Sequence, residues 1–182
     1  MKRRRKDPVY RPDRFEYLQA LLTEFCETDS LGAKHEIVAN LANFAYNPVN
    51  HGHFQKLNIL DLFLDLTDDE DLELRRMGVM GLVNLSVNPH YRDLICQQLN
   101  LILPLLKSRD SETLISTLTL LYYLHPEGIE DGNLRRTFEE LKLKSECSRT
   151  NNLLDLLLRP ATSTSSINHQ LPFSETAGSG TT

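Results

Sequence analysis

Apolar residues recur at helical spacing along most of this chain, and the segments differ in how much of the helix circumference they cover. The segment 14–25 places four large apolar residues on one face, at i, i+3, i+7 and i+10: Phe15, Leu18, Leu22 and Phe25. A second amphipathic helix is predicted over 33–46. The segment 59–66 is apolar nearly all round, which is typical of a buried helix. The pattern therefore predicts helices, with 59–66 as the buried helix of its unit.

Local signals predict where these helices begin and end. Pro48 is expected to open a short helix, because proline fits a first helical turn. Asn58 and Asn100 stand at corresponding points where the chain turns between two helices, and asparagine tolerates the left-handed conformation that such a turn needs. The run 67–70 (Thr-Asp-Asp-Glu) matches a capping box for the helix that follows.

The same cycle then runs again. The segments 72–87 and 110–124 are predicted long helices, 89–99 a short one and 101–107 a buried one. Residues 41–48 (LANFAYNP) return at an offset of 41 as 82–89 (LVNLSVNP), and a third copy, 121–126 (LYYLHP), follows after another 39 with Tyr123 in place of the asparagine. A period near forty predicts stacked helical units, none of which buries its apolar face alone.

The pattern divides the chain into three parts. Residues 13–158 are predicted to form an all-α, right-handed α-solenoid of about three repeats plus a degenerate unit that caps the stack. Helices over 133–144 and 152–158 would build that capping unit. Residues 1–12 are expected to be a basic, disordered N-terminus, and residues 159–182 a disordered tail rich in Ser and Thr.

The repeating unit resembles an armadillo repeat, with a short helix, a turn, a buried helix and a long helix that ends in apolar-x-Asn-apolar. Over residues 7–126 the chain is similar to a family of small nuclear armadillo proteins of the minor, U12-type spliceosome, most densely at 17–21 (YLQAL), 23–25 (TEF), 39–46 (ANLANFAY) and 60–65 (LDLFLD). The resemblance implies a non-catalytic subunit in pre-mRNA splicing. It also implies an RNA-recognition-motif protein as the partner, which holds the capped end of a small nuclear RNA, so that RNA is met indirectly.

Asparagines at matching repeat positions are the candidate binding residues. In armadillo proteins the asparagine at this position lies on a concave groove and binds the backbone of an extended peptide, since an amide offers both a donor and an acceptor. The resemblance thus implies a protein-binding groove formed by Asn40, Asn43, Asn47, Asn84, Asn88 and Tyr123. The alternative is that each asparagine caps or ties a neighbouring turn. For any single asparagine the sequence leaves both interpretations open.

One departure separates this chain from the nuclear import adaptors, which pair each groove asparagine with a tryptophan one turn earlier. Those places hold Ala39, Met80 and Thr119, and the chain contains no Trp. We therefore do not expect it to carry basic import signals of other proteins.

Charge is distributed unevenly along the chain. There are 20 Lys and Arg against 25 Asp and Glu, and one basic run stands at the N-terminus: Lys2, Arg3, Arg4, Arg5 and Lys6. The remaining residues are therefore strongly acidic, which disfavours binding of a nucleic-acid backbone by the solenoid itself. The basic run is predicted to be a localisation signal, with the nucleus as the expected compartment; a solvated terminus or an RNA-phosphate arm are the alternatives.

Motifs for catalysis and metal binding are absent from the sequence. It contains no G-x-S-x-G, P-loop or H-E-x-x-H, and His51 and His53 are spaced so that they point away from each other. The cysteines form no C-x-x-C pair, and no apolar run is long enough to cross a membrane. We expect no enzyme activity, cofactor, metal, small-molecule substrate or membrane association. Two function classes remain, the splicing subunit and a general armadillo-type peptide-binding or signalling scaffold.

Overall fold

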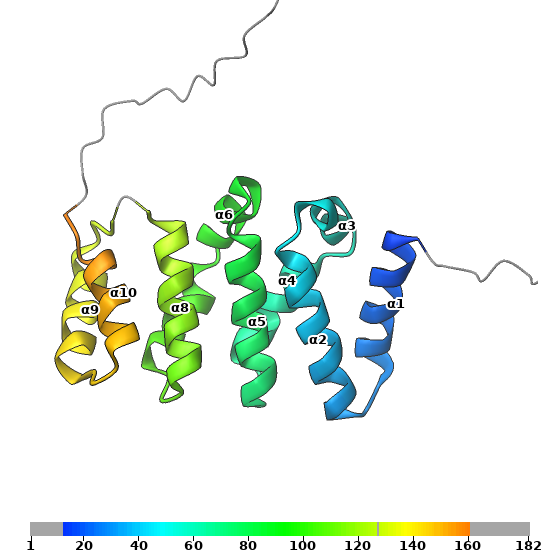
Figure 1. Ribbon diagram of the computed structural model, residues 1–182, viewed down its shortest axis with the longest axis horizontal. Coiled ribbons are helices and arrows are strands. Elements are labelled where there is room, and N and C mark those ends of the chain that lie inside the picture. The colour runs from blue at the N-terminus through cyan, green and yellow to red at the C-terminus, as the bar shows by residue number, and fades with distance from the viewer. Residues whose placement is uncertain (1–12, 127, 161–182) are drawn as a thin grey trace, which may run out of the picture.

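The computed structural model describes residues 13–126 and 128–160, and all regular elements in these ranges are helices. Four helices stand side by side, and we call them the ladder helices: α2 (Leu31–Ala45), α5 (Leu72–Leu85), α8 (Ser111–Leu124) and α10 (Ser148–Leu157). Figure 1 shows them as a row, with α1 (Arg14–Glu27) at the N-terminal end of the stack. The predicted all-helical solenoid is confirmed.

Further helices, most of them shorter, pack against the back and the top of this row in Figure 1. They are α3 (His51–Lys56), α4 (Ile59–Asp65), α6 (Pro89–Cys96), α7 (Leu99–Ile102) and α9 (Gly132–Lys144). Three 3-10 segments extend them: η1 (Pro48–Asn50) leads into α3, η2 (Leu66–Asp68) continues α4, and η3 (Leu103–Lys107) continues α7. The last unit has a single helix, α9, before its ladder helix in the chain, and so it is the simplified cap that the sequence indicates.

The core lies between the ladder helices and the shorter helices. Ile59 and Phe63 of α4 are fully buried, which confirms the prediction of a buried helix over 59–66. Two glycines of α5 permit this contact: a Cβ on Gly81 would lie 2.6 Å from the Phe63 ring, and one on Gly78 would lie 2.7 Å from Cβ of Leu66. The α4–η2 segment therefore packs directly against the backbone of α5.

The two predicted asparagine turns differ. Asn58 has φ 51°, in the left-handed region, as predicted. The prediction for Asn100 is wrong, because Asn100 lies inside α7 and the chain turns at Gln98, with φ −113° and ψ 22°. The offset of 41 that relates the repeats places Leu99, not Asn100, opposite Asn58. A turn at Gln98 needs no positive φ, so no asparagine is required there.

The predicted capping box at 67–70 is also wrong. The chain continues as η2 through this run, and buried Thr67 donates its hydroxyl to the carbonyl oxygen of Leu64 at 2.7 Å. The N-cap of α5 is instead Asp71, which accepts from the backbone N–H groups of Glu73 at 3.0 Å and Leu74 at 2.9 Å. The cap moves by four residues because the preceding helix ends later than its apolar pattern indicates.

Candidate protein-binding site

The ladder packing brings the repeat-equivalent candidates together on neighbouring helices. Asn43 on α2, Asn84 on α5 and Tyr123 on α8 occupy the same position of successive repeats. Asn43 is exposed, Asn84 is half-buried and Tyr123 is 39% exposed. Met80 lies one turn before Asn84 and is 49% exposed. We call these four residues the ladder face.

The two asparagines of the ladder face have different surroundings. The side-chain amide of Asn84 donates to the carbonyl oxygen of Ala42 at 2.8 Å, which ties α5 to the C-terminal turn of α2. Asn43 makes no side-chain hydrogen bond within the part of the chain that the structure describes. Its donor and acceptor therefore remain available, and the groove role of both asparagines stays a prediction.

Two other candidates act as helix caps. Asn47 accepts from the backbone N–H of Val49 at 3.1 Å at the start of η1, and Asn88 accepts from that of His90 at 2.9 Å at the start of α6. They occupy the same position in two repeats, so they illustrate the capping alternative. Asn40 is exposed on α2, and its binding role stays a prediction.

A buried polar cluster around His51 was missed by the sequence reasoning. The His51 ring nitrogen Nε2 lies 2.8 Å from the carbonyl oxygen of Ala45, and Nδ1 lies 2.9 Å from the side-chain nitrogen of Asn88. An amide nitrogen only donates, so Nδ1 accepts, Nε2 carries the proton and the ring is neutral. The Tyr91 hydroxyl donates to the carbonyl oxygen of His51 at 2.9 Å, and burial raises the Tyr91 pKa. The cluster joins the first repeat to the second without charge.

The remaining features add no chemistry to this region. His53 packs against the ring of Phe15 at 5.8 Å, and no group of three or more potential metal ligands gathers in residues 13–126 and 128–160. None of the described helices is both long and apolar enough for a transmembrane span. The basic run Lys2–Lys6 lies outside the described residues, so the localisation signal stays a prediction.

At the N-terminal ends of the ladder helices, a basic residue of one helix repeatedly contacts the N-cap aspartate of the next. His35 Nε2 of α2 lies 2.7 Å from Asp71, the N-cap of α5; Arg76 of α5 donates to both carboxylate oxygens of Asp110, the N-cap of α8, at 3.0 and 2.5 Å. His35 and Arg76 are repeat equivalents, as are the two aspartates. We call these four residues the charged edge.

The charged edge holds its carboxylates ionised. Hydrogen bonds from Arg76, and then from Thr113, hold the pKa of Asp110 well below its usual range. The backbone N–H of Leu74, followed by His35, lowers the pKa of Asp71. The same pairing raises the Arg76 pKa. Asp71, Arg76 and Asp110 therefore serve as fixed charges at the junctions between repeats.

The C-terminal ends of the ladder helices contrast with this. The ends of α2, α5 and α8 lie in stretches without Asp, Glu, Lys or Arg, 37–55, 77–91 and 113–126, although Arg92 donates to the carbonyl oxygen of Ser86 just beyond α5. Apolar side chains are nevertheless exposed there, with Tyr46 and Val49 at 70% and Val87 at 52%. Tyr46, Val87 and the exposed Pro126 are repeat equivalents. We call these four residues the uncharged edge.

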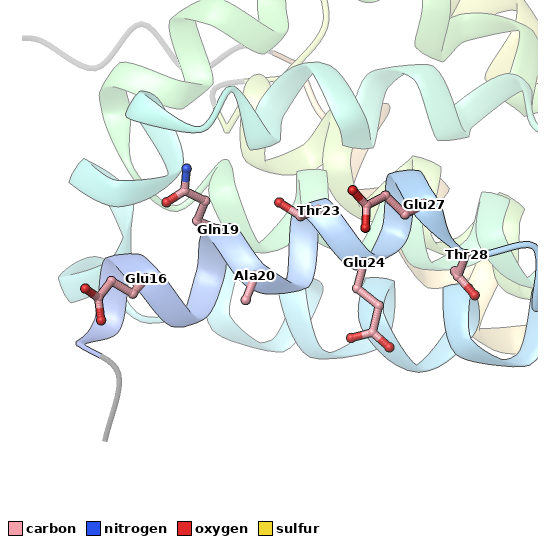
Figure 2. Close-up of a pocket in the computed structure, with 7 residues that line it drawn as sticks. All are labelled: Glu16, Gln19, Ala20, Thr23, Glu24, Glu27 and Thr28. Carbon is pink, nitrogen blue, oxygen red and sulfur yellow. The ribbon is translucent and has the colours of Figure 1, made fainter. Parts of the chain in front are cut away.

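Hollows in the surface lie elsewhere. One of about 560 Å³ follows the outer face of α1, and Figure 2 shows the side chains along it: Glu16, Gln19, Ala20, Thr23, Glu24, Glu27 and Thr28. Another of about 630 Å³ separates the α4–η2 segment from η3. Neither is lined by a predicted binding residue. The ladder face is therefore an open surface, suited to a macromolecular partner rather than to an enclosed small ligand.

Comparison with known proteins agrees with this architecture. No known protein-family profile matches the chain. The mouse (Mus musculus) Armadillo repeat-containing protein 7 is 51% identical over 69 residues, and the chain covers 35% of the length of that protein. That match spans 38% of this chain and confirms the resemblance to an armadillo repeat protein.

Solved structures are similar over more of the chain. An engineered protein matches with a TM-score of 0.65 at 20% identity, over 78% of this chain and 60% of its own. Computationally designed armadillo repeat proteins for modular peptide recognition match with a TM-score of 0.64 at 15% identity, over 79% of this chain and 62% of theirs. At such identities the likeness concerns the fold alone, and it confirms an armadillo-type solenoid.

Proposed function

We propose that this chain is a non-catalytic protein-binding subunit whose ladder face takes an extended segment of a partner protein. The observation that carries the proposal is the row of Asn43, Met80 and Tyr123, exposed on three neighbouring helices. Asn43 has a free amide donor and acceptor for a peptide backbone, and Met80 and Tyr123 provide apolar area beside it. An armadillo scaffold presents such a row along the whole length of its stack.

The proposed partner is an RNA-recognition-motif splicing factor of the minor, U12-type spliceosome. What supports this is the family resemblance carried by 17–21, 39–46 and 60–65. The acidic balance of the chain outside its basic run suits contact with small nuclear RNA through that partner rather than directly. Nuclear localisation through Lys2–Lys6 belongs to the same proposal.

A pull-down from nuclear extract tests both levels of the proposal. The full chain, tagged at its C-terminus, is compared with Asn43→Ala/Met80→Glu and with Leu143→Glu as a control. Leu143 is 88% exposed on α9, away from the ladder face, so its change adds a carboxylate without touching that face. Mass spectrometry identifies the captured proteins, and hybridisation identifies the captured RNA before and after nuclease treatment.

We expect the wild-type chain and the control to retain an RNA-recognition-motif splicing factor after nuclease treatment, and the ladder variant to lose it. Retention by all three chains would remove the ladder face from the proposal while leaving the splicing role. Capture of a nuclease-resistant partner unrelated to splicing, lost in the ladder variant, would instead favour the general peptide-binding scaffold.

A further inference from the structure

The last unit of the stack has one helix fewer than the units before it. Two helices lie between α2 and α5 and again between α5 and α8, whereas α9 alone lies between α8 and α10. In the first two units the additional helix is anchored by a fully buried side chain, Phe54 on α3 and Ile95 on α6. After α8, the described residues 125–126 and 128–131 form no helix and bury only Ile129. Part of the apolar surface of the last unit is therefore left uncovered.

This uncovered surface forms a groove between the last unit and the unit before it. A space of about 260 Å³ lies between the α7–η3 segment, residues 125 and 129–131, and the start of α9. A second space of about 440 Å³ follows η3 and α9, and Leu103, Asp131 and Leu134 line both spaces. Leu99, Leu103 and Leu134 are only partly buried against the adjoining core. We call the two adjoining spaces the terminal groove.

The polar side chains around the terminal groove demand no charged ligand. Burial lowers the pKa of His125, which keeps its imidazole neutral at pH 7. The carboxylate of Asp131 caps α9 and accepts from the backbone N–H of Leu134 at 2.7 Å. Glu130 and Lys107 are exposed and carry opposite charges. The groove therefore suits a segment with apolar side chains and no charge.

The described part of the chain ends beside this groove. Arg135 of α9 donates to the carbonyl oxygen of Ile129, which lines the groove, at 3.1 Å. The same guanidinium donates to the carbonyl oxygens of Leu158 at 2.9 Å and Arg159 at 3.5 Å. Figure 1 shows α9 and α10 at the end of the row opposite to α1. The residues that follow Pro160 therefore start next to the terminal groove.

We propose that the terminal groove is a docking site for residues 167–173 of this chain (INHQLPF). Within 161–182, large apolar side chains occur only in this segment, as Ile167, Leu171 and Phe173. Residues 161–174 include no Asp, Glu, Lys or Arg, so docking brings no charge into the groove. Transfer of these three side chains from water to the partly buried leucines of the groove is what favours docking.

The connection to the described chain has a suitable length. Residues 161–166 (ATSTSS) separate Pro160 from the docking segment, and at about 3.3–3.6 Å per residue they span roughly 20 Å. A short tether gives the segment an effective concentration on the order of millimolar, which favours the groove of its own chain. The docked segment then covers the last unit in place of the missing helix, and the expectation of a disordered tail applies to 161–166 and 174–182. The ladder face is not involved, so this proposal does not rest on the function proposed above.

Tryptophan fluorescence of the full chain tests the proposal, because the chain contains no Trp of its own. Phe173→Trp places the reporter in the docking segment, and Ser165→Trp places it in the linker as the reference. For each reporter the emission wavelength and the quenching by acrylamide are measured. Both are repeated over a range of protein concentrations.

Four further changes are combined with the Phe173→Trp reporter. Ile167→Ser/Leu171→Ser removes the apolar side chains of the segment and leaves every described residue unchanged. Leu103→Gln makes the groove polar, and Asn133→Arg places a long charged side chain in it from an exposed position. Leu143→Gln is the control for Leu103→Gln, since Leu143 lines neither space. Thermal melting by circular dichroism confirms that each variant is folded, and Asn133→Arg carries the test if Leu103→Gln is not.

We expect Trp at 173 to emit at a shorter wavelength than Trp at 165 and to be quenched at least about twofold less, because the groove shields the ring from water. The difference should disappear with the serine pair and Leu103→Gln, shrink with Asn133→Arg and persist with Leu143→Gln. It should be constant across roughly a hundredfold range of protein concentration, since docking within one chain is unimolecular.

Three results would overturn the proposal. The first is equal emission and quenching at the two reporter positions, which would mean that the segment stays in water. The second is a difference that survives both groove variants in the folded chain, which would place the segment elsewhere. The third is a difference that is lost on dilution, which would assign the segment to the groove of a second copy of the chain.

Discussion

The two ends of the ladder helices join the same repeats by opposite means. At the N-terminal ends, a cation of one ladder helix pairs with the carboxylate that caps the next, as in Arg76 with Asp110. At the C-terminal ends, neutral groups join the repeats, since His51 links the carbonyl oxygen of Ala45 to the amide of Asn88. Charged groups thus dominate the contacts at one edge of the stack and neutral groups those at the other, where Arg92 also donates to the carbonyl oxygen of Ser86.

The difference explains how one edge stays apolar without being unstable. Side chains of the chain itself satisfy the carbonyl oxygens of Phe44, Ala45 and Ser86, the first two through the neutral groups of Asn50 and His51 and the third through Arg92. Tyr46, Val49 and Val87 then remain exposed, although the stack gains nothing from them. The charged edge and the His51 cluster both join the repeats, whereas the residues of the uncharged edge stay outside the buried clusters.

The largest expected effect on stability comes from Asn88. Replacement of Asn88 by Ala removes the N-cap of α6 and leaves the His51 ring nitrogen without its donor. Cap loss and an unpaired buried group together cost about 1–3 kcal/mol of unfolding free energy. Asn47→Ala is the matched control, because Asn47 caps η1 at the same repeat position and makes no histidine contact. Equal urea midpoints for the two variants would contradict the coupling role of the His51 cluster.

A somewhat smaller loss is expected at the charged edge. Asp110→Ala removes the cap of α8, which binds both the N–H and the hydroxyl of Thr113, and also the partner of Arg76. Loss of such a cap costs about 0.5–2 kcal/mol. Asp110→Asn keeps the cap and removes the charge, so its urea midpoint should fall between those of wild type and Asp110→Ala. A midpoint for Asp110→Asn equal to that of Asp110→Ala would show that the charge, not the cap, is what matters.

The same edge makes the stability sensitive to acid. A carboxylate with a lowered pKa stabilises the fold above the pKa of the unfolded chain, about 3.9, and loses that contribution as pH falls through the folded pKa. The pKa values of Asp71 and Asp110 are both lowered. We expect the unfolding free energy to decline below about pH 4, and less steeply in Asp110→Asn. Asn88→Ala should keep the wild-type slope, since no carboxylate is involved.

The smallest stability losses are expected for the two ladder-face asparagines, Asn84 and Asn43, and the two losses should differ. Asn84→Ala breaks the bond to the carbonyl oxygen of Ala42 and should cost about 0.5–1.5 kcal/mol, whereas exposed Asn43→Ala should cost almost nothing. Partner affinity, measured by titration, should respond in the opposite order, with up to about tenfold weakening for Asn43→Ala. A loss of stability in Asn43→Ala would mean that its amide has a structural role.

The repeat and its helices could be predicted because their signals are local or periodic. The Asn-Pro turns at 47–48 and 88–89 and the apolar stretch 59–66 each define an element within a few residues. The predicted helix boundaries were wrong where the same residues could belong to either of two neighbouring elements. The 3-10 extension of α4 moved the cap from Thr67 to Asp71, and a one-residue shift between repeats placed Asn100 inside a helix.

The apolar pattern of the sequence does not predict the polar contacts between repeats. His35 and Asp71 are 36 residues apart and Arg76 and Asp110 are 34 apart, so no local motif contains them. A signal was nevertheless present, because the two basic residues and the two aspartates recur at the repeat offsets of 41 and 39. The His51 cluster offered no such signal, since Arg92 stands at the matching position of the next repeat. The binding role of Asn43 depends on a partner, which the sequence of this chain does not contain.

Two double variants compare directly how much each edge contributes to the free energy of unfolding. Asp71→Ala/Asp110→Ala disables the charged edge, and Tyr46→Ser/Val87→Ser removes apolar area from the uncharged edge. In urea unfolding at pH 7, followed by circular dichroism, we predict a clearly lower midpoint for the first. The second should keep the wild-type unfolding free energy within about 0.5 kcal/mol, as expected for exposed positions. A stable first variant together with a destabilised second one would contradict the account.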